Sequence, residues 1–161
     1  MGSDPLSETL NGTIDETRVY NRALTATEVL ALYQSGSTKI GLSNSSPGTL
    51  AQGLTGYWTF DGKDMINNVA DVSGNGWNAF LTNFTSTTTV TGKAGQALTF
   101  DGTNDFVNTN SSVSNFITGP EGTISAWLRP TSVAPNIGSM GEIQNARTAV
   151  SSSVLQAFGI S

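Results

Sequence analysis

The sequence predicts an all-β fold, an antiparallel β-sandwich that carries one short helix near residues 26–34. Short alternations of apolar and polar residues, as at residues 54–60 and 123–129, are typical of half-buried strands. Runs such as Ser73-Gly74-Asn75-Gly76 separate them and have the composition of tight turns. Most polar residues are Ser, Thr, Asn and Gly, which favours strands and turns over long helices.

The first predicted strand and the helix follow each other near the start of the chain. Residues 13–20 alternate imperfectly, but their β-branched and aromatic content predicts a strand. Thr25 is a good N-cap, and Glu28 three residues later completes a capping box. We therefore expect a helix over residues 26–34, with Gly36 as its stop and an apolar face made of Val29, Leu30, Leu32 and Tyr33.

The second half of the chain contains the other predicted strands. Residues 54–60 form a strand whose Trp58 and Phe60 share one parity and should face the core. A loop covers residues 63–76, and further strands are predicted at residues 77–84, 97–100, 105–108 and 123–129, the last ending at Pro130. The tail predicts a loop, a helix candidate at residues 142–150 and an apolar run at residues 154–160.

Four blocks give the chain a family resemblance. They are LTGYWTFDG, DVSGNG, GKAGQALTFDG and GTISAWL, which begin at Leu54, Asp71, Gly92 and Gly122. In this order and spacing they resemble the N-terminal half of a laminin-G-like domain of the concanavalin A-like lectin/glucanase superfamily. Residues 12–29 resemble the last strand and helix of the same family. The resemblance implies a jelly-roll sandwich, but a shared fold is poor evidence for a particular ligand.

The order of these pieces predicts the domain organisation. The tail of one repeat, residues 12–34, precedes a linker at residues 35–52 and the head of the next repeat at residues 53–130. Residues 1–11 are then a lead-in, and residues 131–161 are an unassigned tail.

Within this chain, the strand from the tail of the first repeat can pair with the first strand of the next repeat. The family pairs its first and last strands antiparallel, so residues 13–20 should pair with residues 54–60 as in a circular permutant. A linker of about 18 residues spans roughly 20–25 Å, which is ample. The result is a partial or permuted sandwich whose uncovered sheet edges favour self-association.

Composition excludes several classes of function. A net charge of −5 with only seven Lys and Arg residues argues against nucleic acid as a partner. The chain has no Cys and no His, which removes disulfides, cysteine nucleophiles and the usual general base of a triad. No window is apolar enough to span a bilayer. Low charge and abundant Thr, Ser and Asn suit an extracellular or cell-surface protein, whose export signal is expected outside this chain.

Any metal here would be bound by oxygen, which makes calcium the first candidate. The donors are carboxylates in Gly-rich turns, Asp61, Asp71, Asp101 and Asp105. The competing interpretation, which we favour, is that Asp-Gly and Asn-Gly are simply hairpin turn chemistry. The resemblance implies calcium at the sandwich rim, with Asp61 and Asp71 as the first ligands.

Candidate ligand-binding residues are Trp77, Trp127 and Asn104, because sugar sites combine aromatic platforms with amide hydrogen bonds. Trp127 has the opposite parity to Ile124, so it should face the other side of its sheet. Asp15 and Glu16 are adjacent and should point to opposite faces of their strand, which does not suit two carboxylates that flank a scissile bond.

We therefore expect a non-catalytic carbohydrate-binding or adhesion module from a larger protein, whose partner is a glycan or a cell-surface protein. Two alternatives stay open. The chain could be a structural spacer repeat without a ligand, or an accessory module of a glycoside hydrolase. Exposed aromatic residues on a sheet face would favour binding, and uniformly polar Thr/Ser faces would favour the spacer.

Overall fold

The structure is a computed structural model of the chain, and it describes residues 10–35, 50–85, 89–109, 111, 113–131 and 152–159. Most elements are strands, and most strand pairs are antiparallel. This confirms the predicted all-β fold, whereas the jelly-roll connection of the strands stays a prediction. Most of the predicted linker at residues 35–52 and the helix candidate at residues 142–150 lie outside the described residues.

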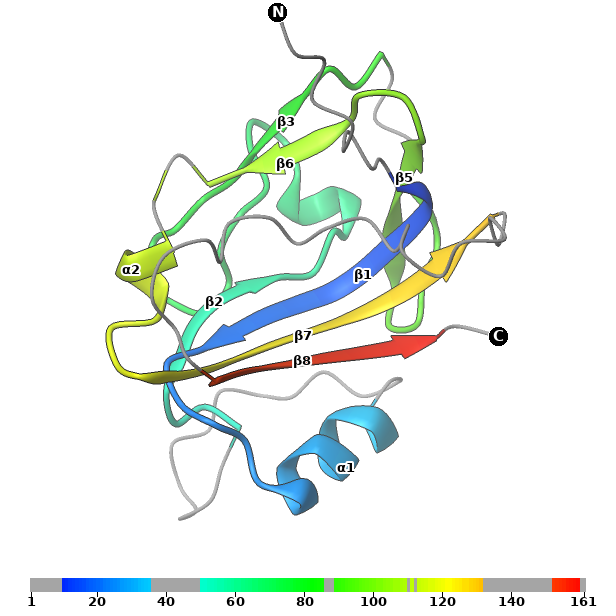
Figure 1. Cartoon of the computed structure of the whole chain (residues 1–161). Coiled ribbons are helices and arrows are strands. Elements are labelled where there is room, and N and C mark those ends of the chain that lie inside the picture. Colours follow the sequence, from blue (N-terminus) through cyan, green and yellow to red (C-terminus); the bar gives the residue numbers. More distant parts are fainter. Residues whose placement is uncertain are drawn as a thin grey trace, which may run out of the picture.

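A six-stranded sheet forms the body of the molecule (Figure 1). Its order is β4-β5-β1-β7-β8, and β2 also pairs with β1. Only β7 and β8 pair in parallel among these strands. The strands are β1 (Asn11–Tyr20), β2 (Leu54–Trp58), β4 (Thr89–Thr91), β5 (Gln96–Asp101), β7 (Glu121–Pro130) and β8 (Ser152–Gly159).

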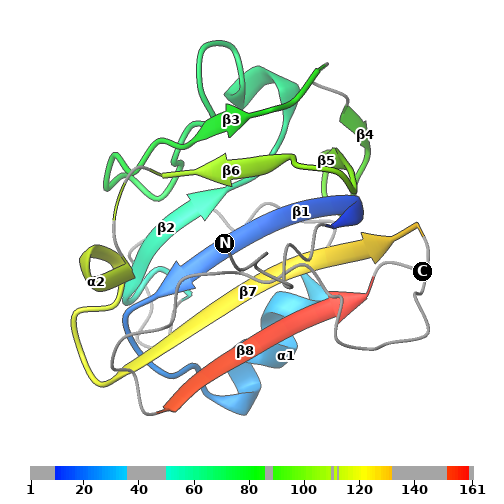
Figure 2. The same cartoon turned by 45° about the horizontal axis from the view of Figure 1, so that its top comes forward.

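A two-stranded sheet of β3 (Phe80–Thr82) and β6 (Phe106–Asn108) lies above the large sheet (Figures 1 and 2). Between the two sheets lies the apolar core, which also contains Phe116 of the short helix α2 (Val113–Phe116). Trp58 and Phe60 are buried in this core, as their parity predicts, and the Trp58 ring meets Phe116 edge-on at 5.8 Å.

The predicted pairing of residues 13–20 with residues 54–60 is confirmed, because β1 and β2 are antiparallel neighbours with Thr17 opposite Trp58. Strand β7 pairs with one side of β1 along most of its length. On the other side of β1, strand β5 pairs with its first half and strand β2 pairs with its second half. The β1–β7 register shifts between Asp15 and Arg18, where Glu16 has a φ of 56°. Strand β1 is therefore bulged where its neighbour changes from β5 to β2.

Helix α1 (Ala26–Gln34) has the predicted bounds and the predicted capping box. The Glu28 backbone N–H donates to the Thr25 hydroxyl, and the Thr25 N–H donates to the Glu28 carboxylate at 2.9 Å. The helix lies on the face of the large sheet away from β3 and β6 (Figure 1), where Tyr33 stacks on Trp127 of β7. The sheet is thus covered on both faces, by the small sheet and by the helix.

Several predicted strands are shorter in the structure. The strand predicted over residues 77–84 is limited to β3, after a bridge between Val69 and Ala79. The predicted loop at residues 63–76 overlaps a 3₁₀ turn, η1 (Gly62–Asp64). The apolar run at residues 154–160 falls mostly in β8.

None of the helices in the described ranges has the length and apolar character needed to cross a membrane.

Candidate functional site

Trp127 lies on the helix-side face of the large sheet, as its parity predicts, but its ring is covered. Only 3% of the residue is exposed. The Tyr33 ring stacks on it with centroids 5.7 Å apart, and the Lys93 Nζ lies 4.4 Å from the ring centroid. Stacking of a sugar on Trp127 therefore stays a prediction that requires Tyr33 or Lys93 to move.

The other two predicted ligand residues lie elsewhere. Trp77 is half-buried and packs against the core, with its ring 5.2 Å from that of Phe116. Asn104 is exposed in the turn before β6, and its backbone carbonyl accepts a hydrogen bond from the Asn83 side chain at 2.9 Å. The structure does not bring Trp127 to these two residues, because Trp127 lies on the opposite face of the large sheet.

The Asp71 carboxylate organises the loop between β2 and β3. It accepts hydrogen bonds from the backbone N–H groups of Tyr57, Ser73 and Trp77, at 3.0, 2.9 and 2.9 Å. The Ser73 hydroxyl donates to it as well, at 2.8 Å. This arrangement is the turn chemistry that we favour for the Asp residues, since the carboxylate oxygens already serve backbone donors.

Asp61 and the Asp101–Asp105 turn have similar roles. The buried Asp61 carboxylate accepts the Gln96 N–H at 2.8 Å, and its other oxygen lies 3.6 Å from the Lys63 Nζ. Asp105 accepts the Asp101 N–H at 3.0 Å. Within the described ranges, no three or more Asp, Glu, His or Cys side chains cluster as a metal site would require. Calcium binding by these residues stays a prediction.

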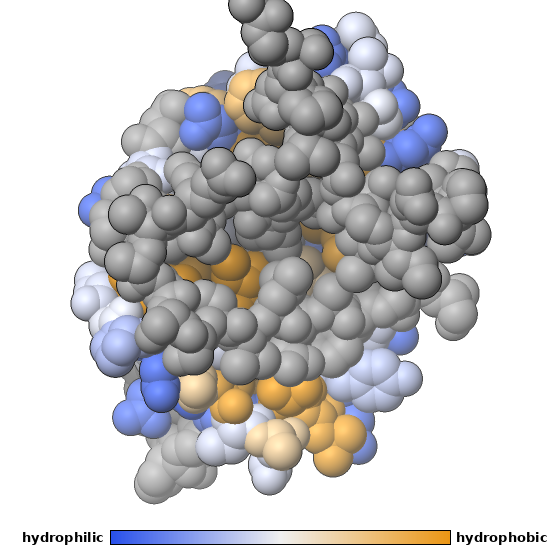
Figure 3. Space-filling model, viewed as in Figure 1, coloured by the Kyte–Doolittle hydropathy of each residue, from blue (hydrophilic) through white to orange (hydrophobic). Residues whose placement is uncertain are grey.

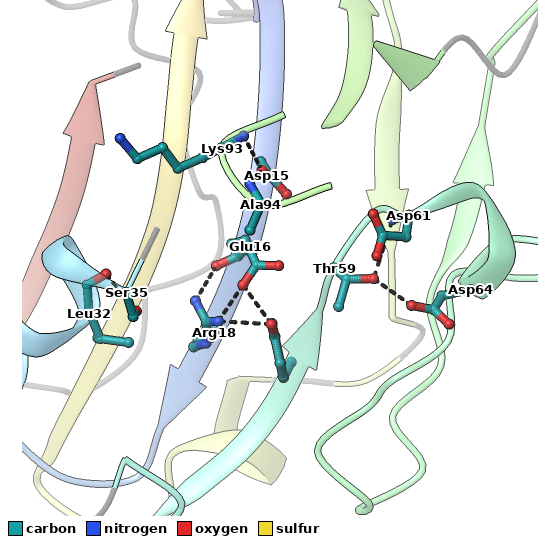
Figure 4. Close-up of polar contacts among 11 residues, drawn as sticks. Asp15, Glu16, Arg18, Leu32, Ser35, Thr59, Asp61, Asp64, Lys93 and Ala94 are labelled. Atoms are coloured by element: carbon teal, nitrogen blue, oxygen red, sulfur yellow. Dashed lines mark hydrogen bonds and ion pairs between the residues drawn. The ribbon is translucent and has the colours of Figure 1, made fainter. Parts of the chain in front are cut away.

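A buried polar cluster on the helix-side face joins β1 to β2 (Figure 4). The Arg18 guanidinium forms an ion pair with the Glu16 carboxylate and donates to the Tyr57 hydroxyl at 2.8 Å. The Tyr57 hydroxyl donates to Glu16 at 2.5 Å, and burial raises the pKa of this tyrosine. All three residues are less than 10% exposed, so the Glu16 charge is satisfied inside the protein.

The expectation that Asp15 and Glu16 point to opposite faces is wrong. Asp15 and Arg18 pair with Trp127 and Ser125, which are two residues apart on β7 and share a face. The Glu16 carboxylate contacts Arg18 on that same face. The bulge at Glu16 breaks the alternation, so both carboxylates lie on the helix side of the sheet.

Asp15 is completely buried under the turn that connects β4 and β5. One carboxylate oxygen, Oδ2, accepts the backbone N–H groups of Lys93 and Ala94 at 2.6 and 3.0 Å. The other oxygen, Oδ1, has no hydrogen-bond partner. Burial, together with the neighbouring Glu16 charge, raises the pKa of Asp15 to about 6, although the backbone donors oppose the shift.

Exposed aromatic side chains occur on the outer face of the small sheet. Phe80 and Phe106 are 45% and 46% exposed, and both belong to strands that turn Leu81 and Val107 toward the core. Phe80 is paired with Asn108, so Phe106 is its diagonal neighbour across the strand pair. The two rings, with Thr82 and Asn108 on the same face, form an uncharged surface that we call the aromatic platform.

The sequence contains the signal for this platform. Alternation around Leu81 places Ala79 and Leu81 on the inside, which leaves Phe80 outside, and the same holds for Phe106 beside Val107. The stacking residues predicted from the sequence, Trp77 and Trp127, are both tryptophans and do not include these phenylalanines. The pairing of β3 with β6, which brings the two phenylalanines together, is a non-local contact that alternation does not predict.

Other exposed apolar side chains belong to segments outside the β3–β6 sheet. Figure 3 shows apolar residues at the lower edge of the molecule, where Figure 1 places α1, and Leu30 there is 52% exposed. Ile66, in the loop after η1, is 81% exposed. Single exposed aliphatic residues are normal for protein surfaces, whereas neighbouring exposed apolar residues that form a patch can mark a binding site.

No protein-family model, no curated protein and no solved structure matches this chain.

Proposed function

We propose that this chain is a non-catalytic carbohydrate-binding or adhesion module whose ligand is a neutral glycan bound on the aromatic platform. The observation that carries the proposal is the exposure of Phe80 and Phe106 as diagonal neighbours on one face of paired strands. Aromatic rings give large contact areas at small cost in side-chain entropy. The strands hold the rings on a packed sheet, which reduces the ordering cost of binding.

The chemistry around the rings favours sugar over other apolar ligands. The Thr82 hydroxyl and the Asn108 amide share the face with the rings, and they can hydrogen-bond to sugar hydroxyls. Neighbouring side-chain amides come from Asn104 and from Asn83, whose Nδ2 donates to the Asn104 backbone carbonyl at 2.9 Å. Sugars expose apolar C–H groups on one side and hydroxyls around the rim, so they match an uncharged ring pair bordered by amides.

Two further observations support a binding rather than a catalytic role. The Glu16 carboxylate is engaged by Arg18 and Tyr57, and Asp15 lies completely buried under a turn. A glycosidase needs two carboxyl groups that can reach a glycosidic bond. Neither of these groups is placed to receive a sugar.

The pairing of β1 with β2 supports the resemblance to laminin-G-like domains, since it joins the family's last strand to its first. We extend the proposal to that family, to an extracellular or cell-surface location and to a calcium ion at the sandwich rim beside Asp61 and Asp71. One fold can carry many functions, so the ligand must be established by experiment.

The test is a glycan array followed by titration calorimetry of the strongest ligand with variants of the purified chain. We expect Phe80→Ala and Phe106→Ala each to weaken binding by about tenfold, the loss of one stacking contact. Ile66→Ala removes an apolar side chain that is even more exposed, at 81%, and that lies outside the β3–β6 sheet, so it should leave affinity unchanged.

Two outcomes would contradict the proposal. A folded chain that binds no glycan would favour the structural spacer. Binding that survives both phenylalanine substitutions would place the site elsewhere, with Trp77 as the next residue to replace.

A further inference from the structure

Asp15 is held in a position that suits a carboxylic acid better than a carboxylate. It is completely buried, and the turn after β4 closes over it (Figure 4). A Cβ on Gly92 would lie 2.5 Å from its Oδ2, which shows how closely the turn approaches. Its Oδ1 is buried with no hydrogen-bond partner. A buried polar atom without a partner is costly, and the cost rises steeply when the group is charged.

The charged groups nearby do not neutralise Asp15. On β1, Glu16 adds a like charge, and Arg18 is committed to Glu16 and Tyr57. Lys93, on the turn itself, directs its side chain across β7, where its Nζ lies 4.4 Å from the Trp127 ring centroid (Figure 4).

The charged groups of β7 and of helix α1 do not neutralise Asp15 either. On β7, Arg129 is exposed and pairs with Thr13 rather than with Asp15. On the helix, Glu28 forms an ion pair with Arg22 at 2.6 Å. No cation in the described ranges makes an ion pair with Asp15, so the charge of an ionised Asp15 is offset only by hydrogen bonds from backbone N–H groups, those of Lys93 and Ala94 among them.

We propose that Asp15 is a pH-operated latch, which in its protonated form seats the turn at residues 92–95 on the sheet and in its ionised form loosens it. Release of the turn admits water to the carboxylate and takes Lys93 away from Trp127. Asp15 and this turn lie on the opposite face of the large sheet from the aromatic platform. The latch proposal therefore does not depend on glycan binding.

The direction of the pH dependence follows from the raised pKa of Asp15. With the turn closed the carboxyl titrates near pH 6, and with the turn open it titrates near its ordinary value of 3.8. The closed state is therefore favoured most below about pH 4, loses stability between about pH 4 and pH 6, and changes little above that.

The test is hydrogen exchange of the Lys93 and Ala94 backbone amides between pH 3.5 and 7, expressed as protection factors. We expect protection in the wild-type chain to fall at least tenfold between about pH 4 and pH 6. In Asp15→Asn the dependence should vanish, because the amide keeps an acceptor for both N–H groups but does not titrate. An equal pH dependence in the variant, or none in the wild type, would overturn the proposal.

A second measurement needs no variant. The Asp15 carboxyl resonance, followed by NMR in the folded full-length chain, should titrate with a midpoint near 6. A midpoint near 4 in the folded chain would overturn the latch. Both measurements are independent of any ligand, so their failure is distinguishable from failure of the glycan site.

Discussion

At Asp71, one carboxylate determines the path of the loop from β2 to β3. Its donors come from Tyr57, Ser73 and Trp77, which lie on both sides of the turn. Hydrogen bonds to a charged acceptor are about twice as strong as neutral ones. This residue therefore has a structural role whether or not calcium binds nearby.

We expect Asp71→Ala to reduce the free energy of unfolding by about 2–4 kcal/mol, because several backbone donors lose their acceptor at once. Urea unfolding with calcium and with EDTA measures this. Asp101→Ala is the matched control, since Asp101 is exposed and its carboxylate accepts the Thr103 N–H. A destabilisation present only with calcium would contradict the turn interpretation and identify Asp71 as a metal ligand.

Alternation along the strands predicts correctly which side of the sheet some side chains face, and it fails for others for identifiable physical reasons. Trp58 and Phe60 are core residues as their parity predicts. The side of the sheet that Trp127 faces was also predictable, but its cover was not, because Lys93 and Tyr33 reach it from distant parts of the sequence. The position of Glu16 was mispredicted because a bulge depends on the neighbouring strands, and no local pattern reports it.

Helix α1 shows how far a local motif can determine an element. Its start follows from the Thr25–Glu28 capping box, which is entirely local. The Glu28 carboxylate also forms an ion pair with Arg22 at 2.6 Å, and the Arg22 side chain donates to the Gln52 carbonyl at 2.8 Å. The helix start is thus linked to the segment that leads into β2.

Glu28 makes this linkage sensitive to acid. Hydrogen bonding to Arg22 lowers the pKa of Glu28 to about 2 from its ordinary value of 4.5. A lowered pKa means that the stabilisation is present above about pH 4.5 and is lost as the pH falls toward 2. We expect Glu28→Gln to be less stable by about 1–3 kcal/mol at pH 7, and the difference to shrink at pH 2.

Chemical denaturation of both chains at pH 7, 4 and 2 checks this expectation. Ser35→Ala serves as the control, because it removes a hydrogen bond at the other end of the helix, from the Ser35 hydroxyl to the Leu32 carbonyl at 3.0 Å, without touching Glu28. A Glu28→Gln effect that stays constant across the pH series would contradict the ion-pair account.

The sequence predicts the positions of the strands more reliably than their lengths. The strand over residues 123–129 is present as β7 and is longer than predicted, whereas that over residues 77–84 is reduced to β3. Strand length depends on the partner, and β3 pairs only with the short β6 within the described sheets. An apolar alternation predicts where a strand lies but not how far its partner extends.

The whole molecule places β1 at its centre, between β7 on one side and β5 and β2 on the other. Strands β4 and β8 end the order of the large sheet in the described part of the chain. Edge strands carry backbone groups that can pair with a second copy. Val90 on β4 is 39% exposed, which adds an apolar side chain to that edge.

We expect the chain to self-associate as its concentration rises, measured by analytical ultracentrifugation. Val90→Lys should shift the distribution toward the monomer, because a charge on an edge strand opposes pairing. Ile66→Lys, on the loop after η1, controls for the added charge alone. A wild-type monomer at all concentrations would contradict the prediction.

We propose that the outer face of the β3–β6 sheet binds a neutral glycan. The most direct measurement is an NMR titration of the isotope-labelled chain with the best neutral oligosaccharide from the array. We predict that the shifted resonances concentrate on Phe80–Thr82 and Phe106–Asn108. Shifts centred on Trp77 or on the helix-side face, or no shifts at any concentration, would show that the aromatic platform is not a glycan site.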